Sequence, residues 1–134
     1  MGYTHYWTLQ NGIEQSAWNK FLEVAREIIT TAKEAGVLIE DNSAGSAIFI
    51  NGVGEQSHET FVITSEDVGF NFCKTAQKPY DSVVTAILIL AKTVFKNDIE
   101  VSSDGSWLDW QGGRLLYEAV IGIDSENVLT KGGE

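Results

Sequence analysis

The sequence predicts a single α+β domain in which helices pack on one face of an antiparallel sheet. Three observations predict this class: apolar residues recur at helical spacing in long segments, shorter apolar or alternating runs indicate strands, and the links between these strands are short and polar. The chain has 134 residues, a length typical of one domain. We expect the order β-α-β-β-β-α-β-α over residues 1–123, followed by a polar tail over residues 124–134 that frays.

The first strand and the first helix follow from two different periodicities. Residues 3–9 alternate aromatic and polar side chains, which is typical of a strand with a mixed face. Residues 16–35 are expected to form a helix, because apolar side chains repeat at helical spacing from residue 18 to residue 32. Gly36 lies just beyond the last turn, where glycine commonly ends a helix.

The middle of the chain predicts an antiparallel meander of three short strands. Residues 47–50 and 60–63 are short apolar runs, and residues 68–72 alternate. The connections between them are polar and contain glycine, as expected of tight links between neighbouring antiparallel strands.

The last third of the chain predicts two more helices with a strand between them. Residues 83–95 repeat at helical spacing and are apolar on nearly all sides at their centre, so this helix is expected to lie deep. Residues 98–102 predict a short strand, and residues 107–120 have helical spacing. Because each glycine in a helix costs about 1 kcal/mol relative to alanine, we expect the third helix to begin after Gly112 and Gly113.

The composition excludes several classes of protein. Lys and Arg number 9 against 19 Asp and Glu, a net charge of −10, which argues against partners such as long nucleic acid or an anionic membrane. The single cysteine, Cys73, excludes an internal disulfide and a cysteine-based zinc site. No apolar run approaches the roughly 18 residues of a membrane span, and we expect a cytoplasmic protein.

The positive charge gathers in one part of the chain. Four lysines and one aspartate between residues 73 and 96 give that segment a charge of +3, so the rest carries −13. Lys74 and Lys78 precede the second helix, followed by Tyr80, and a helix N-terminus with nearby lysines is typical of an anion site. The alternative is that both are solvated loop lysines.

Two further groups of residues favour a binding site, each with a structural alternative. Tyr3, His5 and Trp7 share one face of the first strand, where aromatic rings can stack on a base and a histidine can bond its edge. The alternative is that their apolar bodies cover the helices. His58 and Glu59 enter a later strand, and a carboxylate beside a histidine suits acid–base chemistry or ligand binding. The alternative is ordinary polarity at a hairpin end.

The last candidates follow the strand at residues 98–102. Asp104 and Trp107 can bind the hydroxyls and the ring of a ligand, or can cap a turn and close the core. Known catalytic and metal motifs are missing: His58-Glu59 is followed by Val62 where a zinc-binding helix has its second histidine. We therefore predict no metal, no cofactor and no catalytic residue.

The chain resembles a family of small uncharacterised proteins of bacteriophage and bacterial genomes. The motifs that carry this resemblance are MGYTHYW at residues 1–7, SHETF at 57–61, FCKTAQKPYD at 72–81 and SDG at 103–105. The resemblance implies no established activity. By analogy, small phage proteins of this size often counter host defence, some by sequestering nucleotide signals, and a phage protein would act in the host cytoplasm.

Together these patterns predict a non-enzymatic protein that binds a small anionic, nucleotide-like ligand and forms a homo-oligomer, because exposed aromatic residues need cover. The predicted ligand-binding residues are Tyr3, His5, Trp7, His58, Glu59, Lys74, Lys78, Tyr80, Asp104 and Trp107. One alternative is a small hydrolase or transferase that uses His58 or His5 with Glu59 and Asp104. Another is an acidic protein–protein inhibitor of a host factor.

Overall fold

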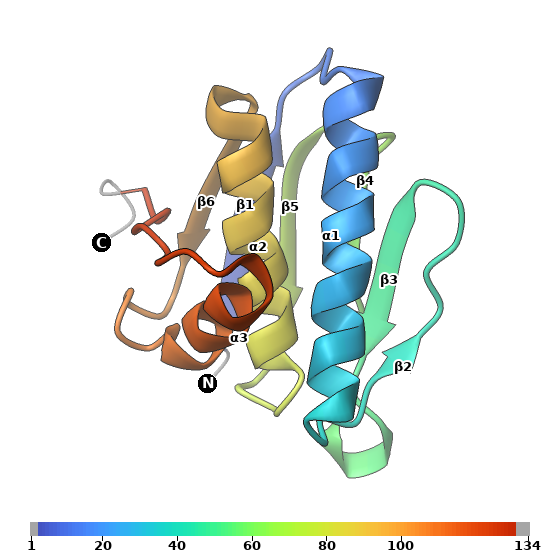
Figure 1. Ribbon diagram of the computed structural model, residues 1–134, viewed down its shortest axis with the longest axis vertical. Helices are drawn as coiled ribbons and strands as arrows, with labels where there is room; N and C mark the ends of the chain where they lie inside the picture. The colour runs from blue at the N-terminus through green and yellow to red at the C-terminus, as the bar shows by residue number, and fades with distance from the viewer. Residues whose placement is uncertain (1–2, 131–134) are drawn as a thin grey trace.

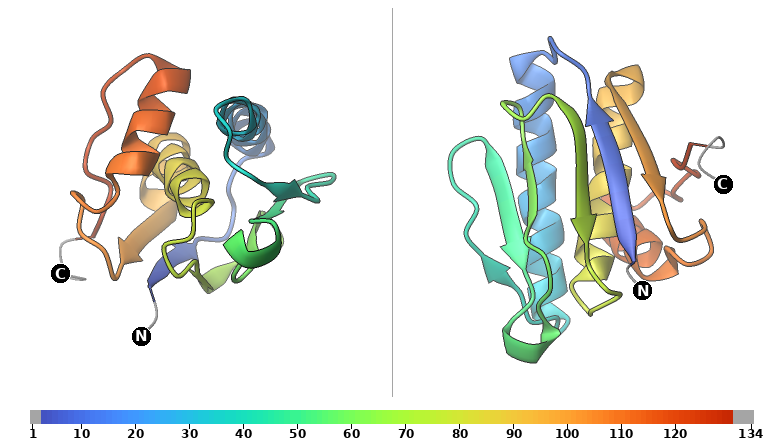
Figure 2. Two further views of the ribbon diagram at one scale, coloured as in Figure 1. Left: turned by 90° about the horizontal axis from the view of Figure 1, so that it is seen from below. Right: turned by 180° about the vertical axis from the view of Figure 1, so that it is seen from behind.

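The helices lie on one side of two small antiparallel sheets in the computed structural model, which describes residues 3–130 (Figure 1). Seen from below, the helices form one layer and the strands the other (Figure 2). The predicted α+β class and element order are confirmed, with one additional two-residue strand, β2. The elements are β1 (Thr4–Leu9), α1 (Gln15–Glu34), β2 (Glu40–Asp41), β3 (Ala47–Asn51), β4 (Phe61–Thr64), β5 (Gly69–Lys74), α2 (Asp81–Phe95), β6 (Ile99–Ser103) and α3 (Gln111–Ile121), with single 3₁₀ turns at Gly54–Gln56 and Lys96–Asp98.

The strand pairing differs from a simple meander. Strands β3 and β4 pair antiparallel as predicted, but β5 pairs with β1, and β1 also pairs with β6. The sheet therefore divides between β4 and β5, which lie side by side in Figure 2 without forming a ladder. Alternation of side chains predicts which face of a strand is buried, but it does not predict the partner strand, and the first strand of the chain takes the central position here.

The face of each sheet toward the helices is apolar, and the opposite face is open. On β1, His5, Trp7 and Leu9 are buried, while Tyr6 is only half-buried on the other face beside the exposed Phe70 of β5. This is the period-two alternation of a sheet covered on one side. The predicted depth of α2 is confirmed, since every residue from Val83 to Ala91 is buried.

The third helix contains both glycines that were expected to precede it. Gly113 packs against α2 so closely that an added Cβ would lie 1.8 Å from Thr85 Oγ1 and 2.9 Å from Ala86 N. Close packing of α3 on α2 therefore requires a glycine at this position, and the contact compensates its low helix propensity. Beside Gly112 the nearest atom is Ser82 Cβ, at an ordinary 3.4 Å.

The segment after α3 is hydrogen-bonded to the domain as far as the structure describes it. Leu129 forms a parallel bridge with Val101 of β6, and Thr130 N donates to Val101 O at 2.9 Å. Ser125 donates to the Glu118 carboxylate from its hydroxyl at 2.6 Å and from its backbone N–H at 2.9 Å. The expected polar tail is thus bound to the domain up to Thr130, and residues 131–134, like residues 1–2, lie outside the described part.

Within residues 3–130, no helix combines the length and the apolar character needed to cross a membrane.

Candidate functional site

Four polar side chains from distant parts of the sequence meet at the start of α2. We call this cluster the His5 junction; it consists of His5 of β1, Thr75 after β5, Asp81 at the start of α2 and Ser103 at the end of β6. His5 is fully buried, with Nε2 2.6 Å from Asp81 Oδ1 and Nδ1 2.8 Å from Ser103 Oγ. The buried Thr75 hydroxyl donates to the same Asp81 oxygen. Each of the four thus has a polar partner, as buried polar groups require.

The hydrogen bonds around Ser103 determine which ring nitrogen of His5 carries the proton. Ser103 Oγ accepts from Gly105 N at 2.9 Å and from Trp110 Nε1 at 3.1 Å. A hydroxyl oxygen has two lone pairs, and these donors use both. The Ser103 hydroxyl must therefore donate to Nδ1, and Nε2–H donates to Asp81. The donors and lone pairs therefore give each hydrogen bond one direction: Ser103 donates to a neutral His5, and His5 donates to the Asp81 carboxylate.

Aromatic rings enclose the His5 junction. Tyr3 and Trp110 both contact the imidazole edge-to-face, with ring centroids 5.1 Å away. The Tyr3 hydroxyl lies against Gly105, where an added Cβ would be 2.0 Å from it. Burial raises the pKa of Tyr3 to about 12, and the Asp81 carboxylate contributes further to this rise. The absence of a side chain at Gly105 thus makes room for Tyr3.

A second polar cluster joins β5 to the chain that enters β4. The Glu59 carbonyl accepts from the Tyr80 hydroxyl and from Cys73 Sγ, and Glu59 Oε1 accepts from Lys74 N at 2.8 Å. Burial, and then the nearby Glu59 carboxylate, raise the pKa of Cys73 to about 12. A thiol with so high a pKa is a poor nucleophile, so Cys73 serves as a small buried hydrophobe.

The predicted site residues are dispersed between the interior and the surface. His5, Trp7 and Tyr80 are buried, and Trp7 packs on Phe61 in the core. Their rings are covered by the protein itself, which matches the structural alternative for the first strand. The remaining predicted residues are partly buried (Tyr3, Glu59, Lys78 and Trp107) or exposed (His58, Lys74 and Asp104).

The structure brings some predicted residues together and separates others. Tyr3 lies with His5, and Glu59 lies with Lys74 and Tyr80. The side chain of Asp104 bonds Thr4 N and the Tyr6 hydroxyl, each at 3.0 Å, instead of His5. His58 is exposed, and its hydrogen bonds to the other described residues join its backbone to the side chain of Asn51. The pairing of His5 or His58 with Glu59 or Asp104 as acid–base partners is therefore absent among the hydrogen bonds of residues 3–130.

Sequence reasoning missed Thr75, Asp81 and Ser103 as members of a site. All three belong to the motifs that carry the family resemblance, FCKTAQKPYD and SDG. The signal was the coincidence of polar residues at strand ends with a histidine that alternation places on the buried face. A buried histidine needs polar partners, so a search for candidates at neighbouring strand ends would have selected them.

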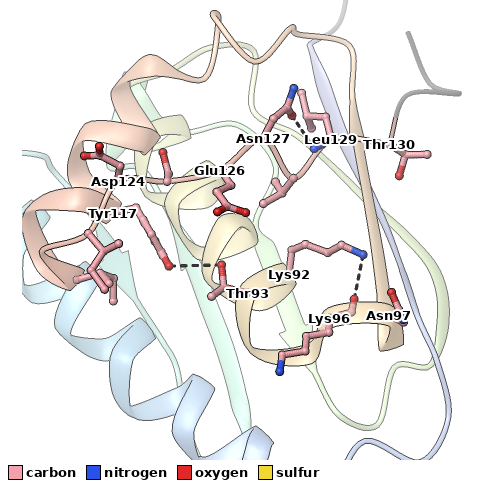
Figure 3. Close-up of a pocket in the computed structure, with 14 residues that line it drawn as sticks. Lys92, Thr93, Lys96, Asn97, Tyr117, Asp124, Glu126, Asn127, Leu129 and Thr130 are labelled. Atoms are coloured by element: carbon pink, nitrogen blue, oxygen red, sulfur yellow. Dashed lines mark hydrogen bonds between the residues drawn. The ribbon is translucent and has the colours of Figure 1, made fainter.

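A wide hollow lies at the other end of α2. It occupies about 700 Å³ between the end of α2, α3 and residues 122–130, and we call it the Lys96 cavity (Figure 3). Its wall combines Tyr117 and Thr93, which share a hydrogen bond at 3.4 Å, with aliphatic side chains such as Leu129. The carboxylates of Asp124 and Glu126 complete the wall on the side of the C-terminal segment.

The two lysines of this cavity differ in their hydrogen bonding. Lys92 Nζ donates to Lys96 O at 2.9 Å and to Ile99 O at 2.8 Å. These bonds satisfy the carbonyls of Lys96, just after α2, and of Ile99, at the start of β6, and they place a cation near the C-terminal end of α2, where it is favourable. Lys96 is exposed and leaves its ammonium group unengaged among the described residues, so it is the cation of this cavity that is available to a ligand.

Lys96 also has an unusual backbone. Its φ is 55° and its ψ is −118°, a combination that glycine adopts readily and other residues adopt at a cost of about 1–3 kcal/mol. A lysine at a position that favours glycine reduces the stability of the fold. Backbone strain often occurs at functional sites, and among the described residues Ala76 and Gln77, before α2, also have positive φ values.

Comparison with family models, with curated proteins and with solved structures finds no match to this chain. The described residues contain no group of three or more His, Cys, Asp or Glu side chains arranged to hold a metal ion. The chemistry of the site therefore has to be inferred from its own residues: a buried hydrogen-bonded cluster at the start of α2 and an open polar cavity at its end.

Proposed function

We propose that this protein binds a small anionic, nucleotide-like ligand in the Lys96 cavity, in the cytoplasm, and holds it without chemical change. The observation that carries the proposal is Lys96 itself, an exposed cation held in a strained backbone at the edge of a 700 Å³ hollow. Ligand sites usually occupy about 300–1,000 Å³, so this volume suits a nucleotide.

The distribution of charge around the cavity supports a ligand with two chemically different ends. Figure 3 shows Lys92 and Lys96 at the end of α2 and Asp124 on the opposite side, across the hollow. A phosphate fits the lysine side, and sugar hydroxyls can donate to carboxylates on the other side. Tyr117 and the aliphatic wall offer an apolar surface to a base.

The junction of Lys74 and Lys78 with α2 is less suited to an anion. The first turn of α2 already contains the carboxylate of Asp81, which interacts favourably with the helix dipole. An added phosphate would meet this negative charge. We therefore assign the anionic group to Lys96 rather than to the lysines before the helix.

Isothermal titration calorimetry against mononucleotides, cyclic dinucleotides and ADP-ribose tests the proposal. We expect one of them to bind, Lys96→Ala to weaken its binding at least about tenfold, as expected for a lost charge-assisted hydrogen bond, and the ligand to be recovered intact by chromatography. The matched control is Lys20→Ala, which removes an exposed lysine of α1 and the same charge.

The outcomes separate the function from its location. If no compound of the panel binds, or if the bound compound is converted, the proposed function is wrong. If Lys74→Ala with Lys78→Ala abolishes binding and Lys96→Ala does not, the ligand binds at the start of α2 and our assignment to the cavity is wrong.

We also propose that the protein forms a homo-oligomer through the open face of the β5-β1-β6 sheet. Phe70 and Phe72 are 64% and 51% exposed on this face, and Tyr6 stacks on Phe70 at 6.0 Å. A contiguous aromatic surface is typical of an interface. Light scattering after size exclusion should give the mass of an oligomer for the wild type and of a monomer for Phe70→Ser with Phe72→Ser; a monomeric wild type would contradict the proposal.

A further inference from the structure

A second hollow, of about 400 Å³, opens beside the His5 junction. We call it the Trp107 hollow, because Trp107 forms part of its wall together with Ser103, Asp104, Asn127 and Leu129. Ser103 is the member of the His5 junction that reaches this surface: it is partly exposed, while His5 behind it is fully buried. Ser103 thus links the buried His5, and through it the Asp81 carboxylate, to a cavity.

The order of the groups is that of an activated serine. The Ser103 hydroxyl donates to His5 Nδ1 at 2.8 Å, and His5 Nε2–H donates to Asp81 at 2.6 Å. A histidine that accepts a serine proton on one ring nitrogen while a carboxylate holds the other is the arrangement that generates a nucleophile in serine hydrolases. Either ring nitrogen can act as the base, provided that the opposite one is fixed by the carboxylate.

The surroundings of Ser103 also favour a charged oxygen. Gly105 N–H and Trp110 Nε1–H both point at Ser103 Oγ, from 2.9 and 3.1 Å. Two preorganised N–H dipoles stabilise negative charge as the hydroxyl loses its proton. Because they occupy both lone pairs of Ser103 Oγ, one of them must release Oγ when it attacks, and that N–H group then becomes free to bond the ester carbonyl oxygen. Thr75 also donates to the Asp81 carboxylate and helps to hold it in place.

From this geometry we propose that Ser103 is the nucleophile of an acyl-transfer site that cleaves small carboxylic esters bound in the Trp107 hollow. Among the described residues, the wall of the hollow includes Asp104 and no basic side chain, so the substrate is an uncharged or cationic ester rather than an anion. This proposal does not rest on nucleotide binding in the Lys96 cavity, which shares Asn127, Leu129 and Thr130 with the wall of the Trp107 hollow.

The reaction proceeds in two balanced steps. Ser103 Oγ attacks the ester carbonyl carbon while its proton moves to His5 Nδ1; the bond from this carbon to the alkoxy oxygen then breaks, and the departing alcohol takes the proton from His5. Water attacks the resulting acyl ester of Ser103 by the same route. One proton of this water moves to His5 and from there to Ser103 Oγ, and the carboxylic acid is released.

Labelling of the wild-type protein with diisopropyl fluorophosphate tests the proposal without depending on the folding of a variant. The phosphorus forms a bond to Ser103 Oγ, fluoride leaves, and the serine proton passes to His5 and then to solvent. We expect one label per chain, which peptide mass spectrometry locates at Ser103. An unlabelled chain, under conditions that label chymotrypsin completely, or a label at other residues would overturn the proposal.

Variants then test the roles of the groups, with hydrolysis of p-nitrophenyl acetate as the readout. Ser103→Ala should reduce the rate at least about a hundredfold, and Asp81→Asn by a similar factor, if their circular dichroism matches the wild type. Ser102→Ala removes the neighbouring hydroxyl, which lines a different hollow on the other face of β6, and should leave the rate unchanged.

The second histidine provides the decisive control. His58 is exposed and can cleave activated esters without any organised site. We expect His58→Ala to retain the serine-dependent rate. If His58→Ala removes the hydrolysis and Ser103→Ala does not, the observed esterase activity is a surface reaction and the proposal is wrong.

Discussion

The two ends of α2 handle polar groups in opposite ways. At the start of the helix, His5, Thr75 and Asp81 are joined by short hydrogen bonds inside the protein. At the other end, Lys92 satisfies the last carbonyls while Lys96 extends to the surface of an open cavity. The first arrangement links four segments of the chain and stabilises the fold, whereas the second adds a strained residue and costs stability. The two ends can therefore be compared by measuring how the removal of a polar side chain at each end changes the free energy of unfolding.

The largest expected effect is at the buried end. His5→Ala removes both the hydrogen bond to Asp81 and the hydrogen bond to Ser103, and it leaves a cavity between Tyr3 and Trp110. We expect a loss of about 3–5 kcal/mol in the free energy of unfolding, measured by urea denaturation. His58→Ala is the matched control, since this histidine is exposed; it should change stability by less than about 0.5 kcal/mol. Equal effects of the two would contradict a structural role of the His5 junction.

The second largest effect is expected where α3 packs against the start of α2. Gly113→Ala would place a Cβ 1.8 Å from Thr85 Oγ1, so the two helices must move apart. We expect a loss of about 1–3 kcal/mol, seen as a lower Tm. Gly112→Ala, one residue away, meets no close atom and should stabilise the helix by about 0.5–1 kcal/mol. A stabilising Gly113→Ala would show that the close approach is not required.

A smaller effect of opposite sign is expected at the open end. Lys96→Gly relieves the strained backbone and should increase the free energy of unfolding by about 1 kcal/mol, while it removes the cation that we propose for ligand binding. Asn97→Gly, where φ is not positive, should stabilise nothing. A stability gain together with lost binding would show that function, rather than folding, requires a lysine here.

The smallest expected effect concerns the segment that closes the Lys96 cavity. The hydrogen bonds from Ser125 lower the pKa of Glu118 below its ordinary value, so the ionised carboxylate is favoured in the folded state. The stabilisation is therefore present above the carboxyl pKa of the unfolded chain and is lost as pH falls through the lower folded value. We expect the Ser125 amide resonance to titrate with a midpoint below the ordinary pKa of a glutamate, and to become independent of this step in Glu118→Gln. An unchanged titration in that variant would contradict the assignment.

The sequence determined the helices, most strands and the depth of α2, because these follow from local spacing of apolar residues. It also identified His5, Glu59, Lys74, Tyr80 and Asp104 as members of polar groups at strand ends. Their partners were not predictable in the same way, since hydrogen bonds such as His5–Asp81 join positions 76 residues apart.

Only the tertiary structure decided which polar residues are enclosed and which are open to a ligand. Antiparallel pairing of β1 with both β5 and β6 brings Thr75 and Ser103 to His5, and this pairing depends on long-range contacts that alternation cannot specify. In the same way, the sequence alone indicates that Gly113 disfavours a helix, whereas the structure shows that it lets α3 pack closely against Thr85 of α2. Local spacing determines which face of an element is buried, and packing between distant elements determines what that face meets.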